Sequence, residues 1–293
     1  MKFNQKTKAI CCIIASAFCF AVMNNFVHLA GDLPTFEKAF FRNLVSMFIA
    51  MSALLRKHES FRPTRGCLPQ LFGRAICGTM GILCNFYALD HLVVADASML
   101  NKMSPFFAII FSYFLLKEKL SVPQGIAVII AFLGSMLIVK PTLTNMDLIP
   151  SLIGLFGGMS AGMAYTLVRV LGKKGERGDY IVFFFSAFST IVVAPLMIAS
   201  WEPMTVTQLL CLLVAGLAAA GGQFGITKAY CYAPAREISV YDYTQVIFAA
   251  LIAWFLFDQV PDRYSILGYC IILGVAVAMF LYNNRKPKPA ENG

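Results

Sequence analysis

Long apolar segments follow one another along almost the whole chain and constrain its fold more than any other feature. A helix needs about 20 residues to cross the roughly 30 Å hydrocarbon core of a bilayer, whereas a membrane β-strand needs only about ten. Ten segments have the helical length: residues 9–30, 36–55, 68–89, 94–116, 122–139, 148–171, 180–200, 206–230, 238–257 and 264–282. We therefore predict an all-α integral membrane protein with ten transmembrane helices.

Composition and charge support this prediction. Hydrophobic residues make up 59% of the chain and charged residues 13%, whereas soluble domains carry about 25% charged residues. If the N-terminus is cytoplasmic, most lysines and arginines fall in segments on the cytoplasmic side, which predicts that both termini are cytoplasmic. The net charge of +9 is spread over these loops and tails, so we expect no nucleic-acid partner.

The second half of the chain repeats the first at an offset of 140 residues. Glu118 then lies over Asp258, and Gly134 over Gly274. Five helices per repeat is an odd number, so the two copies are expected to insert with opposite orientations. We predict a first repeat at residues 1–140, a second at 141–283 and a basic cytoplasmic tail at 284–293.

The same offset places Lys102 over Asp242, and both charges lie several residues inside apolar segments. A charge near a helix centre costs roughly 2.5–3.5 kcal/mol to insert, so such residues face a partner or a water-filled cavity. We predict that both line one polar cavity between the repeats, with Asn101, Tyr241, Tyr243 and Gln245 beside them. The alternative is a lysine that snorkels to the headgroups and an aspartate satisfied by a neighbouring helix.

Other polar residues lie in the apolar segments: Asn24, Asn25, His28, Arg42, Arg74, Asn85, Tyr165, Gln223 and Lys228. We add Asn25, Arg42, Asn85 and Tyr165 to the candidate substrate-binding residues. For Arg42 and Arg74 a structural role near the interface is an equal alternative. Asp242 and His28 are candidates for proton coupling, since imidazole titrates near neutral pH.

Three glycines at a spacing of four, Gly154, Gly158 and Gly162, are predicted to let another backbone approach closely. The pattern Gly-Met-Ser-Ala-Gly at residues 158–162 lies mid-segment, where a hydrolase nucleophile elbow does not form. The three histidines and nine cysteines show no metal-ligand spacing. We therefore expect no enzyme activity, no cofactor and no metal, although an intramembrane enzyme or a non-transporting scaffold remains an alternative.

Several segments resemble a known family. They are residues 36–42, 85–98, 104–108, 115–119 and 229–234, together with Asp-Gln-Val-Pro-Asp at 258–262. These stretches are similar to the EamA branch of the drug/metabolite transporter superfamily, and residues 36–42 and 241–262 also resemble S-adenosylmethionine uptake carriers. Lys102 departs from the general family pattern, and Asp258 stands where a glutamate is common.

The resemblance implies a carrier that works by alternating access from a site between the repeats. No ATP-binding loop pattern occurs, so we expect a secondary transporter in a bacterial inner membrane, as a monomer or homodimer. The expected substrate is a small zwitterionic or amphipathic metabolite, such as an amino acid or derivative, S-adenosylmethionine included. The alternative is an exporter of aromatic or cationic compounds by proton antiport.

Overall fold

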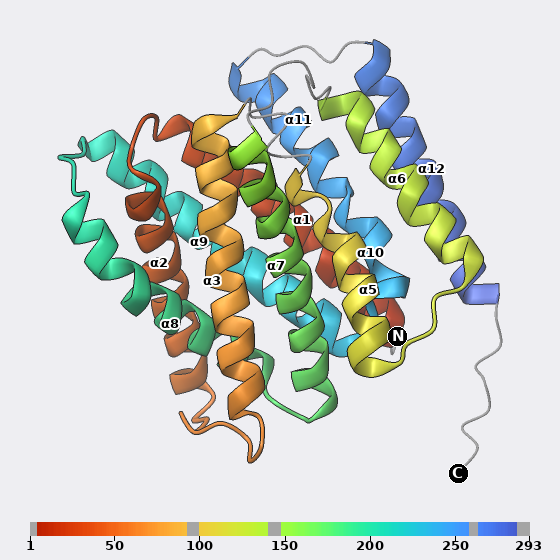
Figure 1. The fold of residues 1–293 in the computed structure, drawn as a ribbon, viewed down its shortest axis with the longest axis horizontal. Coiled ribbons are helices and arrows are strands. Elements are labelled where there is room, and N and C mark those ends of the chain that lie inside the picture. Colours follow the sequence, from red (N-terminus) through yellow and green to blue (C-terminus); the bar gives the residue numbers. More distant parts are fainter. Residues whose placement is uncertain (1–4, 93–99, 140–147, 258–262, 286–293) are drawn as a thin grey trace.

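A computed structural model of the chain describes residues 5–92, 100–139, 148–257 and 263–285 (Figure 1). The named elements within these ranges are all helices, which agrees with the predicted all-α fold. They are α1 (Gln5–Leu29), α2 (Thr35–Arg56), α3 (Leu68–His91), α5 (Ser104–Leu116), α6 (Val122–Val139), α7 (Leu148–Lys173), α8 (Gly178–Ala199), α9 (Val206–Tyr232), α10 (Ala235–Asp242), α11 (Thr244–Phe257) and α12 (Arg263–Arg285). Asp258 and most of the predicted basic tail lie outside the described residues.

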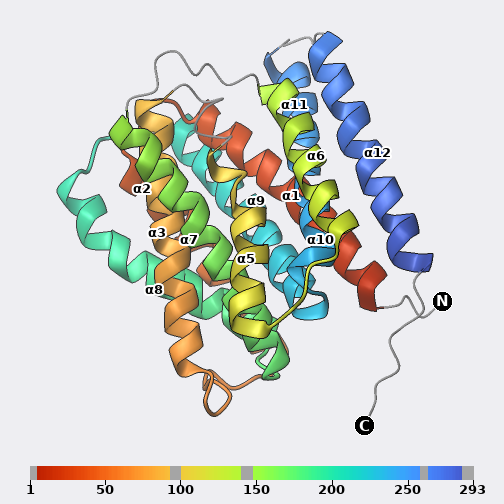
Figure 2. The ribbon, with the colours of Figure 1, turned by 45° about the vertical axis from the view of Figure 1, so that its right-hand side comes forward.

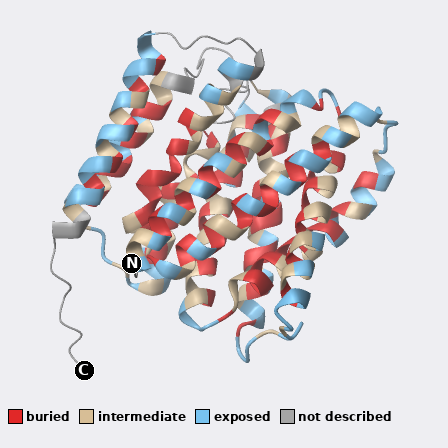
Figure 3. Cartoon of the chain, turned by 180° about the vertical axis from the view of Figure 1, so that it is seen from behind, coloured by how far each residue is buried: buried red, intermediate tan, exposed pale blue. Residues whose placement is uncertain are grey.

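The outer surface of the bundle suits lipid. Within the described ranges, six helices are long and apolar enough to span a membrane, namely α1, α2, α7, α8, α9 and α12, and α5 and α6 are shorter apolar helices. Large apolar side chains point outward, among them Phe114, Ile191 and Phe255, while the buried residues line the inside of the bundle (Figure 3). An apolar exterior around a packed interior is expected of a multi-pass membrane protein.

Two segments that we predicted as unbroken helices are interrupted. In the segment 94–116, α5 begins only at Ser104, after a turn at Lys102 and Met103. Pro105 lies in the first turn of α5, where its missing N–H costs nothing. In the segment 238–257, Tyr243 separates α10 from α11, and the Thr244 hydroxyl donates a hydrogen bond of 2.7 Å to the carbonyl of Tyr241. Non-helical backbone at membrane depth is tolerated where it is buried in protein or lines a cavity.

The helices pack in pairs that link the two halves of the chain. Helix α1 of the first half packs on α9 of the second, and α7 of the second half packs in the same way on α3 of the first. In the same way α5 packs on α7 as α11 packs on α1, while α2 pairs with α8 and α6 with α12. Figures 1 and 2 show the α6–α12 pair at one edge of the bundle. Each half therefore packs against the other, and the broken helices contact the opposite half through α7 and α1.

The glycine face of α7 holds the first of the two breaks in place, which confirms the predicted close approach. A Cβ added to Gly158 would lie 2.6 Å from the carbonyl oxygen of Leu100, and one on Gly162 would lie 2.8 Å from that of Ser104. Only glycine leaves room for the backbone at these distances. The sequence of α7 thus fixes the segment that carries Lys102.

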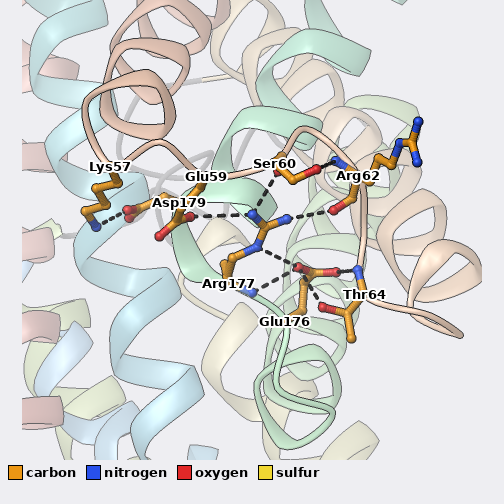
Figure 4. A network of polar contacts seen from close by, with 8 residues as sticks. All are labelled: Lys57, Glu59, Ser60, Arg62, Thr64, Glu176, Arg177 and Asp179. Atoms are coloured by element: carbon orange, nitrogen blue, oxygen red, sulfur yellow. Dashed lines mark hydrogen bonds and ion pairs between the residues drawn. The ribbon is translucent and has the colours of Figure 1, made fainter.

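Two loops at one end of the bundle are joined by the charged network of Figure 4. Arg177 donates hydrogen bonds of 2.8 and 2.7 Å to the carbonyl oxygens of Ser60 and Arg62, and it lies 3.7 Å from carboxylate oxygens of Glu59 and Glu176. Glu176 also accepts a hydrogen bond from the backbone N–H of Thr64.

A further ion pair in Figure 4 joins the end of α2 to the start of α8. Lys57, which follows α2, pairs with Asp179 in the first turn of α8. These contacts tie the α2–α3 loop to the α7–α8 loop, which the charge pattern predicts to be cytoplasmic.

Candidate substrate-binding site

The two broken helices meet through their charged residues. Lys102 Nζ lies 3.3 Å from Asp242 Oδ2, and it donates hydrogen bonds of 2.7 Å to Gln245 Oε1 and 3.4 Å to the carbonyl of Asp242. In return the Tyr243 hydroxyl donates to the carbonyl of Lys102 over 3.1 Å. Both charged side chains are largely buried, with 12% of Lys102 and 8% of Asp242 exposed.

Lys102 and Asp242 are also the two residues that the offset of 140 superimposes. In a structure built from two related halves, a residue contacts its own counterpart only close to the axis that relates the halves. The ion pair is therefore evidence that the two breaks lie at the centre of the molecule. The reading of Lys102 as a lysine that snorkels to the headgroups does not agree with this contact.

A cavity of about 100 Å³ opens beside this ion pair. Seven residues that we proposed from the sequence line it: Arg42, Asn85, Asn101, Lys102, Tyr165, Asp242 and Gln245. They come from α2, α3, α7, the segment before α5 and the α10–α11 break. Residues from both halves of the chain thus converge on one polar space, although their role in binding stays a prediction.

Four candidates lie outside this cavity. Tyr241 is 3% exposed and belongs to the apolar core, and Tyr243 is fully buried with its hydroxyl on Lys102. Successive residues of a helix point about 100° apart, so an inward Asp242 turns its two tyrosine neighbours away. Asn25 donates to the carbonyl of Ala21 within α1, and His28 lies in the last turn of that helix. Tyr241 and Tyr243 therefore do not line this cavity, and a part for them in binding stays a prediction.

The lining also includes residues that were absent from our candidate set, among them Asn24, Arg74 and Gln223. Arg74 is 2% exposed, and its Nη2 donates a 3.0 Å hydrogen bond to Gln223 Oε1. Its guanidinium stacks 4.1 Å above the ring of Phe185. The sequence signal was Gly78, one turn after Arg74, because a Cβ there would lie 2.1 Å from Arg74 Nη1.

Arg42 is the second buried guanidinium of the cavity and is 4% exposed. Its Nε lies 3.1 Å from the sulfur of Met23, and its Nη1 donates a 3.1 Å hydrogen bond to Asn43 Oδ1. Within the described part of the chain, neither Arg42 nor Arg74 has a carboxylate within ion-pair distance. The same ranges contain no group of three His, Cys, Asp or Glu residues that could hold a metal ion.

The sequence profile of the EamA-like transporter family matches residues 7–140 and, a second time, residues 152–281. The chain belongs to the EamA-like transporter family. Family and relatives are membrane transporters and not enzymes, in agreement with the sequence prediction. The two matched stretches are the two halves whose helices pack on each other in this EamA-like protein.

Relatives span nearly the full length of this EamA-like protein. A pseudopaline exporter of Pseudomonas aeruginosa is 32% identical and covers 94% of this chain and 96% of its own. Solute carrier family 35 member G1 of Homo sapiens is 26% identical over 93% and 80% of the two chains. An S-adenosylmethionine uptake transporter of Rickettsia prowazekii is 23% identical over 90% and 89%.

A solved crystal structure shares the fold. It superposes with a TM-score of 0.82 at 15% identity and covers 96% of this chain and 99% of its own.

Proposed function

We propose that this EamA-like protein is a secondary transporter that moves a small zwitterionic or amphipathic metabolite, such as an amino acid or derivative, by alternating access. The observation that carries this proposal is the Lys102–Asp242 pair, 3.3 Å apart beside a cavity between two broken helices. A carboxylate of the substrate would bind Lys102, and an ammonium group would bind Asp242. Binding would thus open the existing ion pair and replace it with two new ones.

The proposed architecture is ten transmembrane helices in two inverted repeats, residues 1–140 and 141–283, with both termini cytoplasmic in a bacterial inner membrane. Three observations support it: the double match of the family profile, the exchange of helix pairs between the halves, and the bacterial relatives. The broken helices fit a carrier, since discontinuous helices at the repeat interface form the binding sites of many secondary transporters.

Export is the direction that we propose. The pseudopaline exporter is 32% identical, whereas the S-adenosylmethionine uptake transporter is 23% identical. Uptake of external substrate by inside-out and by right-side-out vesicles tests the direction, with the compound identified by the thermal-shift screen as the substrate. Faster accumulation in inside-out vesicles is the expected result, and faster accumulation in right-side-out vesicles would reverse the assignment.

A thermal-shift screen of the detergent-purified protein tests the site. The panel contains amino acids, S-adenosylmethionine, polyamines, nucleosides and aromatic cations, because a ligand that binds only the folded state raises Tm. We expect a zwitterion to give a saturable shift that disappears in both Lys102→Ala and Asp242→Ala. Lys57→Ala, outside the cavity, is the control that keeps it. A shift that survives both cavity variants would place binding elsewhere.

Proton coupling through Asp242 is part of the proposal, because carboxylates inside membrane segments mark the proton relays of many pumps and transporters. In proteoliposomes, Asp242→Asn is expected to lose accumulation driven by a pH gradient. Accumulation by Asp242→Asn that still follows the pH gradient would exclude this residue as the proton carrier. His28→Gln, outside the cavity, is expected to keep gradient-driven accumulation.

A further inference from the structure

The charges that line the cavity do not balance. Its lining holds three cations, Arg42, Arg74 and Lys102, and one carboxylate, Asp242. The lining therefore carries a net charge of +2. Arginine stays charged at neutral pH. The excess therefore persists in the absence of substrate.

The excess belongs to the two arginines and not to the lysine. Lys102 is neutralised by Asp242 at 3.3 Å. Arg42 and Arg74 contact only uncharged groups in the described ranges: a thioether, two side-chain amides and a phenyl ring. A buried charge without a counter-ion is costly. The fold accepts this cost at two positions in one cavity.

Arg74 also has unused hydrogen-bond donors. Its Nε and Nη1 are buried and have no hydrogen-bond partner among the described residues. The large majority of buried side-chain polar atoms in proteins have a hydrogen-bond partner. Arg74 thus lines the cavity with only Nη2 engaged, in its hydrogen bond to Gln223. Carboxylates and phosphates are the groups that best satisfy free guanidinium donors, because they accept paired hydrogen bonds.

We propose that Arg42 and Arg74 form a second anion-binding subsite, so that the substrate carries another acidic group, a carboxylate or a phosphate, besides the carboxylate at Lys102. This inference rests on the proposed function, because it takes the cavity as the substrate site. The substrate class narrows to acidic amino acids or their derivatives. Polyamines, aromatic cations and S-adenosylmethionine, which has two cationic centres, would add positive charge to a cavity that already holds an excess.

Matched amino-acid pairs test the subsite in a thermal-shift assay of the purified full-length protein. L-glutamate is compared with L-glutamine, and O-phospho-L-serine with L-serine, because the members of each pair differ at the second acidic group. We expect saturable shifts from the acidic member of at least one pair, with an affinity roughly 10- to 100-fold above that of its neutral partner. A shift from glutamate identifies a carboxylate, and one from phosphoserine alone identifies a phosphate.

Two arginine variants assign the effect to the subsite. Arg42→Gln and Arg74→Met are expected to lower the affinity for the acidic member to that of the neutral member. Arg74→Met also removes a buried unpaired cation, so its Tm without ligand is expected to rise by roughly 2 °C or more, whereas a purely structural arginine would lower Tm when replaced. Arg62→Met, an exposed arginine, is the control with unchanged affinity.

The outcomes separate this inference from the proposed function. If glutamine or serine shifts Tm through Lys102 and Asp242 as strongly as its acidic partner, the transporter proposal stands and the second subsite is wrong. Acidic shifts that persist in both arginine variants also overturn the subsite. If no compound of either pair gives a shift, the acidic amino-acid class is wrong, and the broader panel decides the proposed function.

Discussion

Arginines in the charged network of Figure 4 and in the central cavity differ in their partners and in their burial. Arg177, whose side chain is 28% exposed, has two backbone carbonyls and two carboxylates around it. Arg74, 2% exposed, has one amide and one phenyl ring. Desolvation is more costly in the cavity, yet the counter-ions lie in the loops. Stability alone would favour the reverse arrangement, so the unpaired cavity charges are evidence for a ligand.

The Lys102–Asp242 pair is the one place where the cavity resembles the network, and its disruption is expected to have the largest effect. Lys102→Ala leaves Asp242 buried without a partner, which costs about 3 kcal/mol in the free energy of unfolding. The double variant Lys102→Ala/Asp242→Asn removes both charges and is expected to regain most of that stability. Transport in proteoliposomes should fall by about 100-fold or more in both variants.

The two readouts together decide whether the pair serves stability or binding. Chemical denaturation in detergent gives the free energy of unfolding, and uptake of the identified substrate gives the transport rate. A double variant that is both stable and active would mean that the pair takes no part in binding.

A methyl group at Gly78 is expected to have the next largest effect. An added Cβ would lie 2.1 Å from Arg74 Nη1 and 2.7 Å from the ring of Phe185, so Gly78→Ala must displace the guanidinium. Substrate affinity should fall about tenfold, as expected when one charged hydrogen bond is lost. Gly274→Ala is the matched control, because a Cβ there meets no atom within 4 Å. Equal affinities of the two variants in a binding titration would contradict the role of Arg74.

The sequence predicted the all-helical fold and the placement of Lys102 and Asp242 at one cavity better than it predicted the place of Arg74. Apolar length and the 140-residue offset depend only on residue order, so the helices and the Lys102–Asp242 match were accessible. The break at Tyr243 could not be predicted, because the segment 238–257 contains no proline that would indicate an interruption. Tyr241 and Tyr243 were chosen for proximity in sequence, but helical rotation turns them away from the cavity.

Arg74 shows what sequence reasoning lacks at such a site. An arginine a few residues inside a helix is compatible with a lipid headgroup or a loop carboxylate as partner, and only the packing of α3 on α7 and α8 shows that neither lies beside it. Gly78 was visible, but its meaning depends on which side the arginine points. Whether a counter-ion lies beside a buried arginine depends on three-dimensional packing, and residue order alone does not show it.

Replacement of Arg177 sharpens the contrast between the two regions because its effect on stability should have the opposite sign to that of Arg74→Met. Arg177→Met removes hydrogen bonds to the carbonyls of Ser60 and Arg62 and frees two carboxylates. We expect the free energy of unfolding to fall by about 1 kcal/mol, with substrate affinity unchanged. Chemical denaturation measures the first and a binding titration the second. A stabilised Arg177→Met protein would remove the contrast.

The Lys57–Asp179 pair should give the smallest effect. The hydrogen bond and charge of Asp179 raise the pKa of Lys57. A raised pKa in the folded state means that the stabilisation is fully present below the ordinary lysine pKa of about 10.4 and is lost as the pH rises through the raised value. Lys57 is 54% exposed, so water screens the pair and its contribution stays below about 1 kcal/mol.

Asp179 also explains why this loss should be small. It lies in the first turn of α8, where the helix dipole stabilises a carboxylate without help from lysine. The difference in stability between the wild type and Lys57→Met should therefore be small at pH 8 and vanish toward pH 11. A difference that grows with pH, measured by urea denaturation at both values, would show that the network depends on Lys57 for more than its charge.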